Sequence, residues 1–383
     1  MELREYRFDE VSINYDKKRV PLSGVQREKR KGDYRYYGAQ GVIDYVDDYI
    51  FDGTFLLIAE DGENLKSKKQ NIAQVVNGQF WVNNHAHIVT GNELCDTHYL
   101  CYLINSMDLS GYVTGSAQPK LSQANLNAIL LLLPQIKIQK KIVDYLRKID
   151  EKIELNTRIN ENLLQQALAI YKAWFCDYVL SDGVLPESWH ITTIGALSSL
   201  VTRGIAPKYD DRSNQIVLNQ KCIRDHTINV SLARRHLPKK INEKWISKGD
   251  LLINSTGTGT LGRVAQVWFD ANNMTVDSHV TIVRPKATIL QSYIGFWGLS
   301  HESKIEAQHT GSTGQTELLR DRVKAMELPF PDEDTLSKFN ELVIPMTDAV
   351  VSNQKENARL SQLRDNLLPK LMSGEIDVSE LEL

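Results

Sequence analysis

Two long stretches of the chain, Ile142–Trp174 and Phe339–Leu371, decide the fold. The first reads IVDYLRKIDEKIELNTRINENLLQQALAIYKAW and the second reads FNELVIPMTDAVVSNQKENARLSQLRDNLLPKL. In both, apolar residues recur at alternating intervals of four and three, the seven-residue repeat of a helix that packs along one seam. The predicted seam comprises Ile142, Leu146, Ile149, Ile153, Asn156, Asn160, Leu163, Ile170, Phe339, Val343, Met346, Val350, Asn353, Asn357, Leu360, Leu367 and Leu371.

The seam contains two asparagines in each stretch, at equivalent positions. A buried asparagine weakens a coiled coil but fixes its register, because an amide that faces an apolar side chain goes unpaired. We therefore expect the two helices to pair as an antiparallel coiled coil. The alternative is two amphipathic helices that lie on separate domains.

The segments before the two helices repeat as well. Three pairs of segments match in order, with offsets of 194–196 residues: Gly53–Ile58 with Gly249–Asn254, Asn84–Val89 with Ser278–Val283, and Thr114–Ser116 with Thr310–Ser312. A duplication of this kind determines the architecture before any single motif does.

We predict a mixed α/β (α+β) fold with two similar globular domains, joined by two long helices and related by a pseudo-two-fold axis. The predicted boundaries are 1–135 and 181–331 for the domains, and 136–180 and 332–383 for the helices and tail. Strands are expected at Thr54–Ile58, Asp250–Ile253 and Val264–Phe269, and helices at Tyr99–Asn105, Tyr293–Ser300, Leu121–Ile129 and Leu318–Met326. The acidic tail after Gly374 is expected to fray.

Composition excludes several classes of protein. The 383 residues carry 45 basic and 48 acidic side chains, and 42% are hydrophobic, which is ordinary for a globular protein with a core. No apolar run approaches the ~18–20 residues that a membrane span needs. Four cysteines are too few and too scattered for a disulfide scaffold, and the charged N-terminus does not resemble a signal peptide, so we expect a cytoplasmic protein.

Positive charge gathers at similar places in the two halves. Residues 17–37 hold eight basic and two acidic side chains, and residues 203–263 hold twelve basic and five acidic ones. Basic stretches with aromatic and hydroxyl neighbours are typical of surfaces that contact phosphate and base edges, although a solvated charged face or ordinary turn chemistry is the alternative.

We take the basic, aromatic, amide and hydroxyl side chains of these regions as candidate DNA-binding residues. In the first half they are Lys17, Lys18, Arg19, Arg27, Lys29, Arg30, Lys31, Tyr34, Arg35, Tyr36, His85, Gln118 and Lys120. In the second half they are Arg203, Lys208, Lys221, Arg224, Ser255, Thr256, Thr258, Arg263, His279, Ser312, Thr313, Gln315 and Thr316. At ~1.5 Å per residue the first helix would span roughly 50 Å, which suits two major-groove contacts on one DNA duplex.

Two other motifs suggest different chemistry. Gly257–Gly262 spells G-x-G-x-x-G, but the β-like residues that follow favour a hairpin or loop over a dinucleotide site. Cys95, His98 and Cys101 have metal-ligand spacing, but the second half lacks them, so we expect no metal site. We find no catalytic nucleophile, P-loop or zinc-protease motif, and a self-contained nucleotide-binding enzyme remains only an alternative.

Taken together, these residues resemble the specificity (S) subunit of type I restriction–modification systems over nearly the whole chain. The resemblance rests on the order of several short segments: YYGAQGVI at 36–43, YIFDG at 49–53, LIAEDG at 57–62, IDEKI at 149–153, LPESW at 185–189, GDLL at 249–252 and LLPKLMSGEI at 367–376.

The resemblance implies a non-catalytic subunit with two target-recognition domains, each of which reads one half of a bipartite DNA sequence. The coiled coil would set the spacer. Two methyltransferase (M) subunits would dock on it, carrying S-adenosylmethionine for adenine-N6 methylation, and motor-nuclease (R) subunits would supply ATP- and Mg2+-dependent cleavage of a type I site-specific deoxyribonuclease. No cofactor is expected in this chain. A specificity component of another restriction class, or a protein-only dimerisation scaffold, are the alternatives.

Overall fold

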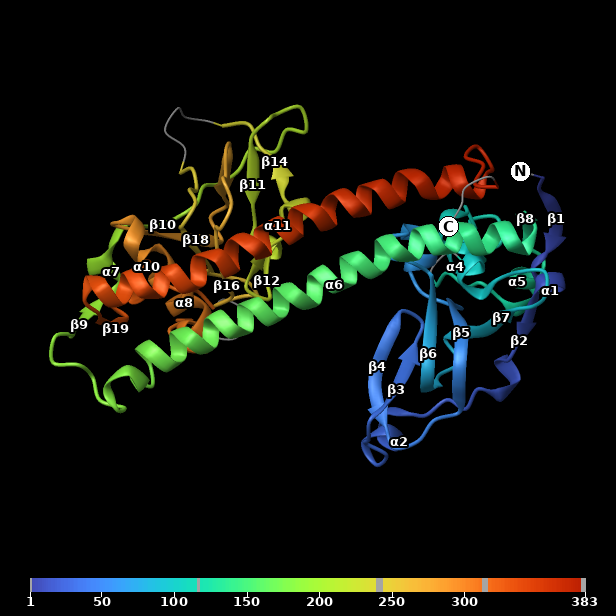
Figure 1. The fold of residues 1–383 in the computed structure, drawn as a ribbon, viewed down its shortest axis with the longest axis horizontal. Coiled ribbons are helices and arrows are strands. Elements are labelled where there is room, and N and C mark those ends of the chain that lie inside the picture. Colours follow the sequence, from blue (N-terminus) through green and yellow to red (C-terminus); the bar gives the residue numbers. More distant parts are fainter. Residues whose placement is uncertain (1, 116–117, 239–243, 312–315, 380–383) are drawn as a thin grey trace. The chain divides into compact units, whose positions relative to one another are not determined.

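The computed structural model describes residues 2–115, 118–238, 244–311 and 316–379. It forms two compact units: Met1–Glu154 with Asn357–Leu383 (unit 1), and Leu155–Glu356 (unit 2). Each unit contains a sheet-bearing part and a portion of both long helices, α6 (Ile136–Phe175) and α11 (Glu333–Met372) (Figure 1). Both helices start two residues after a proline, Pro134 or Pro331. Proline is compatible with a position near the start of a helix.

Unit 1 is built on a six-stranded sheet in the order β2-β7-β5-β6-β3-β4, with a separate antiparallel pair β1-β8. Its strands are β1 (Arg4–Arg7), β2 (Ser12–Asn14), β3 (Tyr34–Gly38), β4 (Gly41–Val46), β5 (Phe51–Ala59), β6 (Ala73–Val82), β7 (Ala86–Gly91) and β8 (Leu130–Leu133). Its shorter helices are α1 (Phe8–Val11), α2 (Gly24–Glu28), α3 (Asn64–Ser67), α4 (Thr97–Ser106) and α5 (Gln123–Asn127), with a 3₁₀ turn η1 at Asp16–Lys18.

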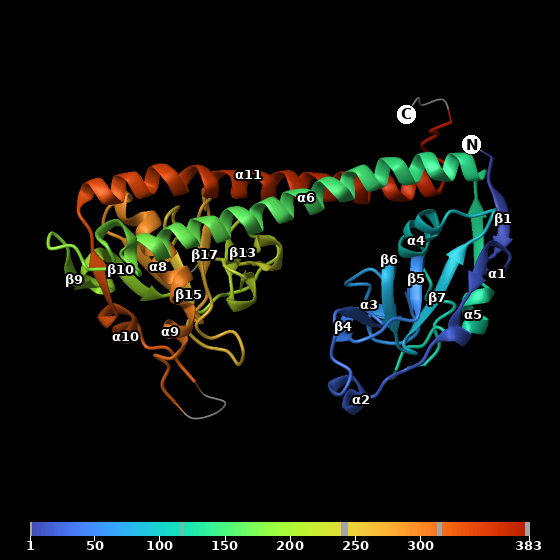
Figure 2. The same ribbon diagram turned by 60° about the horizontal axis from the view of Figure 1, so that its bottom comes forward.

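The central strand β5 has apolar side chains on both faces. Leu56 and Ile58 pack against α4 and the long helices, whereas Leu57 packs into the aromatic cluster on the opposite face, because successive strand residues point to opposite sides. Figure 2 shows α2 and the β3-β4 hairpin at the end of the sheet away from the long helices of this unit. The sheet is therefore anchored at one end and presents its loops at the other.

Unit 2 has a four-stranded sheet, β10-β18-β15-β16, and an antiparallel pair β9-β19. It also has a three-stranded sheet β14-β11-β17 and a hairpin β12-β13. Its strands are β9 (His190–Thr193), β10 (Ser198–Arg203), β11 (Ile216–Leu218), β12 (Ile223–Arg224), β13 (Thr227–Ile228), β14 (Arg234–Arg235), β15 (Leu251–Asn254), β16 (Val264–Gln266), β17 (Met274–Val276), β18 (Val280–Pro285) and β19 (Glu327–Phe330).

Unit 2 also contains shorter helices and 3₁₀ turns. They are α7 (Ile194–Leu197), α8 (Gln291–Ser300), α9 (Glu302–Glu306) and α10 (Arg320–Ala325), with 3₁₀ turns η2 (Val179–Ser181), η3 (Gln220–Cys222), η4 (Val230–Leu232) and η5 (Thr288–Leu290). The predicted helices at Tyr99–Asn105 and Tyr293–Ser300 are confirmed as α4 and α8, and those near residues 121 and 318 are confirmed as the shorter α5 and α10.

The two units share a core topology. The strand order β2-β7-β5-β6 in unit 1 matches β10-β18-β15-β16 in unit 2, and β1-β8 matches β9-β19. The predicted internal repeat and mixed α/β fold are confirmed. The units differ outside this core: β3 and β4 extend the unit 1 sheet, whereas unit 2 inserts β11–β14 in the corresponding part of the chain.

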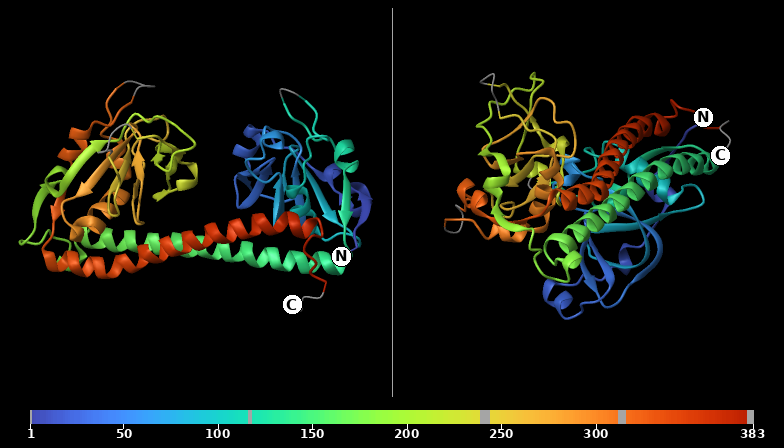
Figure 3. Two further views of the ribbon diagram at one scale, coloured as in Figure 1. Left: turned by 90° about the horizontal axis from the view of Figure 1, so that it is seen from above. Right: turned by 60° about the vertical axis from the view of Figure 1, so that its left-hand side comes forward.

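The long helices pair antiparallel in both units, which confirms the coiled coil over the alternative of separate helices. In unit 2 the Asn353 side chain donates to Asn160 Oδ1 over 2.8 Å. In unit 1 Arg364 bonds Asp150 over 2.8 Å, so a later residue of α11 meets an earlier residue of α6. Figure 3 shows α6 and α11 side by side in both views. The predicted seam residues are all buried or partly buried.

Three local predictions need correction. The described part of the tail does not fray, because Val378 is only 2% exposed in the unit 1 core and Lys141 donates to the Ser379 carbonyl. The strand predicted at Val264–Phe269 ends at Gln266, and the strand predicted at Thr54–Ile58 is longer and spans Phe51–Ala59. The prediction of a hairpin at Gly257–Gly262 is confirmed, since this segment joins the antiparallel strands β15 and β16.

Candidate nucleic-acid interface

In both units the same three connections meet at one end of the sheet. In unit 1 they are the segment after β5, the turn before β7 and the loop that ends at Lys120, which bridges to Asp61 and Thr114. His85 Nδ1 lies 2.6 Å from Asp61 Oδ2. The two candidate residues His85 and Lys120 are thus brought together, and exposed Gln118 lies in the same loop.

Unit 2 repeats this arrangement with different side chains. His279 Nδ1 lies 2.6 Å from Thr256 Oγ1, and Glu317 bridges to Thr256 and Thr310. His279 and Thr258 are exposed, and Thr316 is partly buried. The candidates Ser312, Thr313 and Gln315 lie outside the described residues.

A buried cluster of charges supports this end of unit 1. His87 Nδ1 lies 2.6 Å from Asp16 Oδ2, and its Nε2 lies 2.8 Å from the Leu121 carbonyl. Because both partners are acceptors, both bonds form only when the ring carries two protons. Arg19 donates to Glu60 over 2.8 Å, and Lys120 reaches the other Glu60 oxygen at 3.3 Å. The cluster ties η1, β7 and the loop before α5 to one another.

The charges of this cluster determine how its carboxyl groups titrate. Burial disfavours the charged form of Asp16, but hydrogen bonds from His87 and the Ile88 N–H outweigh burial and lower the pKa of Asp16. The pKa of Glu60 is also lowered, because the bond from Arg19 and the charge of His87 outweigh burial. Both groups therefore stay ionised when the unit is folded. The Arg19 guanidinium is only 15% exposed and is fully engaged here, so we withdraw it from the candidate surface.

Unit 2 has a neutral pair at the matching positions. Ser255 Oγ and Thr281 Oγ1 lie 2.6 Å apart, and both residues are fully buried. A base or phosphate cannot reach Ser255, so we withdraw it as well. Arg203 forms an ion pair with Glu317 and donates to the Leu318 carbonyl over 3.0 Å. The ion pair at this end of unit 2 therefore uses the carboxylate of Glu317, at the position that Lys120 has in unit 1.

Much of the basic stretch in unit 1 is neutralised by carboxylates on or just after β4. Arg27 and Lys31 each lie 2.9 Å from a different oxygen of Asp44, and Arg30 lies 2.9 Å from Asp47. Hydrogen bonds from Lys31, the Tyr45 N–H and Arg27 lower the pKa of Asp44 to about 2. The net charge of residues 17–37 therefore overstates the positive charge of this surface, because Asp44 and Asp47, which compensate it, lie later in the sequence.

The remaining candidate residues of unit 1 differ in their exposure and in their partners. Lys17, Lys18 and Lys29 are exposed, and none of them forms an ion pair within the described ranges. Arg35 donates to the Asn77 carbonyl, and Tyr34 stacks against Tyr49. Tyr36 is fully buried and accepts a hydrogen bond from the Leu22 N–H, so we withdraw it from the candidate surface.

Three unit 2 candidates come together around one hollow. Lys221, Arg224 and Arg263 line a hollow of about 510 Å³, together with Asp225, Thr227, Asn229, Leu232 and Thr260. Lys208 is exposed elsewhere in the unit. Residues that are separated by 42 positions in sequence thus form one positively charged surface.

The cysteines of the Cys95, His98 and Cys101 motif are buried or partly buried in unit 1. Cys95 precedes α4 and is buried, and Cys101 Sγ bonds the Ala73 carbonyl at 3.5 Å. Burial raises the pKa of both thiols to about 12, which opposes the thiolate form that metals bind. In the part of the chain that the structure describes, no group of three or more His, Cys, Asp or Glu side chains could hold a metal ion.

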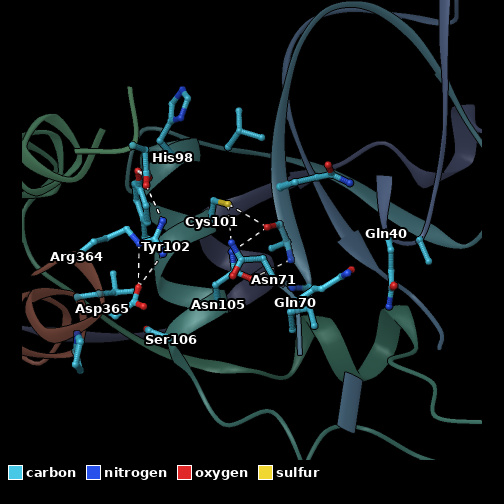
Figure 4. A pocket seen from close by; sticks show the side chains of 18 residues that line it. Gln40, Gln70, Asn71, His98, Cys101, Tyr102, Asn105, Ser106, Arg364 and Asp365 are labelled. Atoms are coloured by element: carbon cyan, nitrogen blue, oxygen red, sulfur yellow. Dashed lines mark hydrogen bonds and ion pairs between the residues drawn. The ribbon is translucent and has the colours of Figure 1, made fainter. Parts of the chain in front are cut away.

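Sequence reasoning missed a larger cavity in unit 1. It measures about 750 Å³ and lies between α4, β6 and the long helices (Figure 4). The Tyr102 hydroxyl donates to Asp150 Oδ2 over 2.5 Å, and Arg364 pairs with the other oxygen of that carboxylate. Amide side chains including Gln70, Asn71 and Asn105 line the rest.

Comparisons with known proteins show which proteins this chain resembles. The model of the type I restriction modification DNA specificity domain matches residues 3–165. A Haemophilus influenzae chain, provisionally named as a type I restriction enzyme specificity subunit, is 25% identical over 381 residues, which cover 94% of each chain. By these matches the chain is similar to type I specificity subunits, and residues 3–165 match the model of their DNA specificity domain. The MjaIX specificity subunit of Methanocaldococcus jannaschii is 26% identical over 310 residues, 74% of this chain and 70% of that one.

A solved structure has the same fold as this chain. The type I restriction–modification S subunit of M. genitalium aligns over 97% of this chain and 96% of that one, with a TM-score of 0.63 and 13% identity. Members of the specificity-subunit family are generally non-catalytic. Among the described residues of this chain, no helix is both long and apolar enough to cross a membrane.

Proposed function

We propose that this chain acts as a type I specificity subunit that binds double-stranded DNA sequence-specifically, and that each unit reads one half of a bipartite target. The observation that carries the proposal is the duplicated loop cluster, in which His85 with Asp61 and His279 with Thr256 occupy equivalent places on equivalent sheets. Two copies of one surface with different polar side chains suit two different half-sites, because base edges are read by the donor and acceptor pattern of the side chains.

The coiled coil has a separate part in this proposal. It sets the spacer between the half-sites, and two methyltransferase subunits dock on it and supply S-adenosylmethionine for adenine methylation. Motor-nuclease subunits join through them and use ATP and Mg2+. This chain itself binds no cofactor in the proposed complex, which acts in the cytoplasm.

Genome-wide mapping of N6-methyladenine tests the proposal. In cells that hold the partner subunits, deletion of this chain should abolish methylation of one split motif. Replacement of residues 1–134 by the equivalent segment of a related specificity subunit should change one half of the motif and leave the other. A genome whose methylated motifs are unaffected by deletion would contradict DNA recognition by this chain.

Insertion of one helical turn in both long helices tests the role of the coiled coil. The two insertions together should keep the seam paired and lengthen the unread spacer, with both half-sites unchanged. A specificity component of another restriction class would give the same split motif but would purify without a motor-nuclease subunit.

A further inference from the structure

The hollow of unit 2 has the chemistry of an anion site. Lys221 lies in η3, Arg224 ends β12, and Arg263 immediately precedes β16, so three separate segments each contribute a cation. Hydroxyl groups of Thr227 and Thr260 and the amide of Asn229 also line it. The only carboxylate in its wall is that of Asp225.

The cations of this hollow are largely uncompensated within the unit. Lys221 and Arg263 form no ion pair among the residues that the structure describes. Arg224 lies 3.6 Å from Asp225, but these side chains are 71% and 88% exposed, and such surface ion pairs are weak because solvent screens them. Glu302 on the nearby α9 lies 3.4 Å from His226 and accepts from the Val264 N–H, and the charge of Arg263 also stabilises its ionised form without a direct ion pair. A bound anion would therefore not have to displace a strong internal partner.

The turn that supplies Thr260 also contains backbone N–H groups that lack a partner among the described residues. Gly257, Gly259 and Gly262 all have positive φ, and a Cβ at Gly257 would lie 2.3 Å from Thr260 Oγ1. The N–H groups of Thr258 and Gly259 make no hydrogen bond to any described residue. Successive free N–H groups in such a turn favour anions.

Two lysines in the corresponding connection of unit 1 are held by backbone carbonyls. In this connection, between β5 and β6, Lys66 donates to the Gly115 carbonyl and Lys68 to the Met107 carbonyl, each over 2.9 Å. Ile72 immediately precedes β6, where Arg263 immediately precedes β16. Arg27 in α2 and Arg30 in its flank already face Asp44 and Asp47 in unit 1.

We propose that the unit 2 hollow binds a phosphate group, and that this phosphate belongs to the DNA backbone beside the half-site that unit 2 reads. The proposal rests on the proposed DNA-binding function and adds that the two units contribute unequally to salt-dependent affinity. A free nucleotide has the same phosphate chemistry, and the Gly257–Gly262 sequence makes it the alternative source, so the experiment separates the two.

The test uses the intact complex of this chain with its methyltransferase subunits and a duplex that carries the mapped target. Affinity is measured against salt concentration for the unmodified complex and for a Lys221→Gln/Arg224→Gln/Arg263→Gln variant. Loss of one phosphate contact should lower the slope of log affinity against log salt by about one, with a similar loss of affinity for all sequences. An Arg212→Gln/Lys286→Gln/Lys324→Gln variant removes three exposed cations of unit 2 that lie outside the hollow and outside both long helices, and it should keep the original slope.

Neutral methylphosphonate linkages, placed one at a time in the duplex, locate the contacted phosphate. One position beside the unit 2 half-site should weaken binding of the unmodified complex and have no further effect on the hollow variant. An unchanged salt slope in a hollow variant that melts at the original temperature would overturn the proposal. ATP or pyrophosphate binding that the hollow variant loses, with the DNA slope unchanged, would also overturn it and assign the hollow to free nucleotides. If the unmodified complex does not bind the duplex at all, the proposed function itself fails.

Discussion

Units 1 and 2 share one core topology but stabilise its recognition end in opposite ways. Where unit 1 buries His87 and Glu60 within an ion cluster, unit 2 buries the hydroxyl pair of Thr281 and Ser255. A buried charge must be paired and hydrogen-bonded, whereas a hydroxyl pair satisfies itself. The comparison teaches that the fold does not require the charges, so they belong to the particular chemistry of unit 1.

A second difference lies where each sheet-bearing part packs on the long helices. Tyr102 of unit 1 reaches Asp150 across a polar cavity, whereas Phe296, its counterpart in the repeat, is fully buried in unit 2. In unit 2, several aromatic side chains pack together in this region. Phe296 packs against Phe339, and Phe175 packs against Tyr293. The contact between the sheet-bearing part and the long helices is therefore closely packed with aromatic side chains in unit 2. In unit 1 the same contact contains a cavity with polar side chains.

The largest expected difference between the units concerns the buried ion cluster. Asp16→Asn should destabilise unit 1 by roughly 3–5 kcal/mol, because it leaves the charges of His87 and Arg19 without their partner. The Ser255→Ala/Thr281→Val variant removes both partners of the unit 2 pair and should cost less than about 1 kcal/mol. Urea denaturation of both variants measures this difference, and equal losses would contradict the comparison.

Acid should weaken unit 1 more than unit 2 at this end. The pKa values of Asp16 and Glu60 are lowered by folding, so their contribution to stability is complete above their ordinary values of 3.8 and 4.5. It is lost as the pH falls below these values and through the lowered pKa of each group. Urea midpoints between pH 6 and pH 3 should therefore fall less steeply in Asp16→Asn than in the original chain; parallel curves would exclude this cluster as the acid-sensitive element.

A reciprocal exchange at the helix junction should give a smaller effect. Tyr102→Phe removes the bond to Asp150 and should cost about 1–2 kcal/mol in unit 1. Phe296→Tyr places a hydroxyl in the packed aromatic cluster of unit 2 and should cost roughly 1–3 kcal/mol, because the buried hydroxyl lacks a partner. If Phe296→Tyr leaves the stability unchanged in thermal and urea unfolding, the new hydroxyl finds a partner or reaches water, contrary to what the packing of this part of unit 2 indicates.

The smallest expected effect compares two neighbouring lysines in unit 1. Lys29 is exposed without an ion pair in the described chain, whereas Lys31 lies 2.9 Å from Asp44 and 3.1 Å from Glu28. If unit 1 contacts phosphate through this surface, Lys29→Gln should lower the salt slope of DNA affinity by up to about one, and Lys31→Gln by less. Charge reversal of Arg27, Lys29, Arg30 and Lys31 together should flatten the slope further. Equal slopes for the two single variants would show that ion pairing within unit 1 does not decide which lysine contacts DNA.

Sequence periodicity was sufficient for the parts of the fold that depend on local spacing. The seam of α6 and α11, the duplication and the helices α4 and α8 follow from which residues are apolar and how far apart they stand. The candidate site was less predictable. Tyr36 and Ser255 have the side chains of a DNA surface but lie in the interior, because each sits on or beside a strand whose burial depends on distant segments.

The cavity of unit 1 shows why contacts between residues far apart in the sequence could not be predicted. Asp150 and Arg364 are 214 positions apart, and Tyr102 stands 48 positions before Asp150. No local pattern marks them as partners, because only the antiparallel pairing of the helices brings them together.

By itself, the order of amino acids determined the two copies of one module and the paired helices, since repeats and heptads are written in spacing along the chain. Only the tertiary structure decided which charges are available for a ligand. Arg27, Arg30 and Lys31 face carboxylates that follow them in sequence, whereas Lys221 and Arg263 converge on one hollow and form no ion pair among the described residues. Electrostatic compensation depends on distance in space, and distance along a chain does not report it.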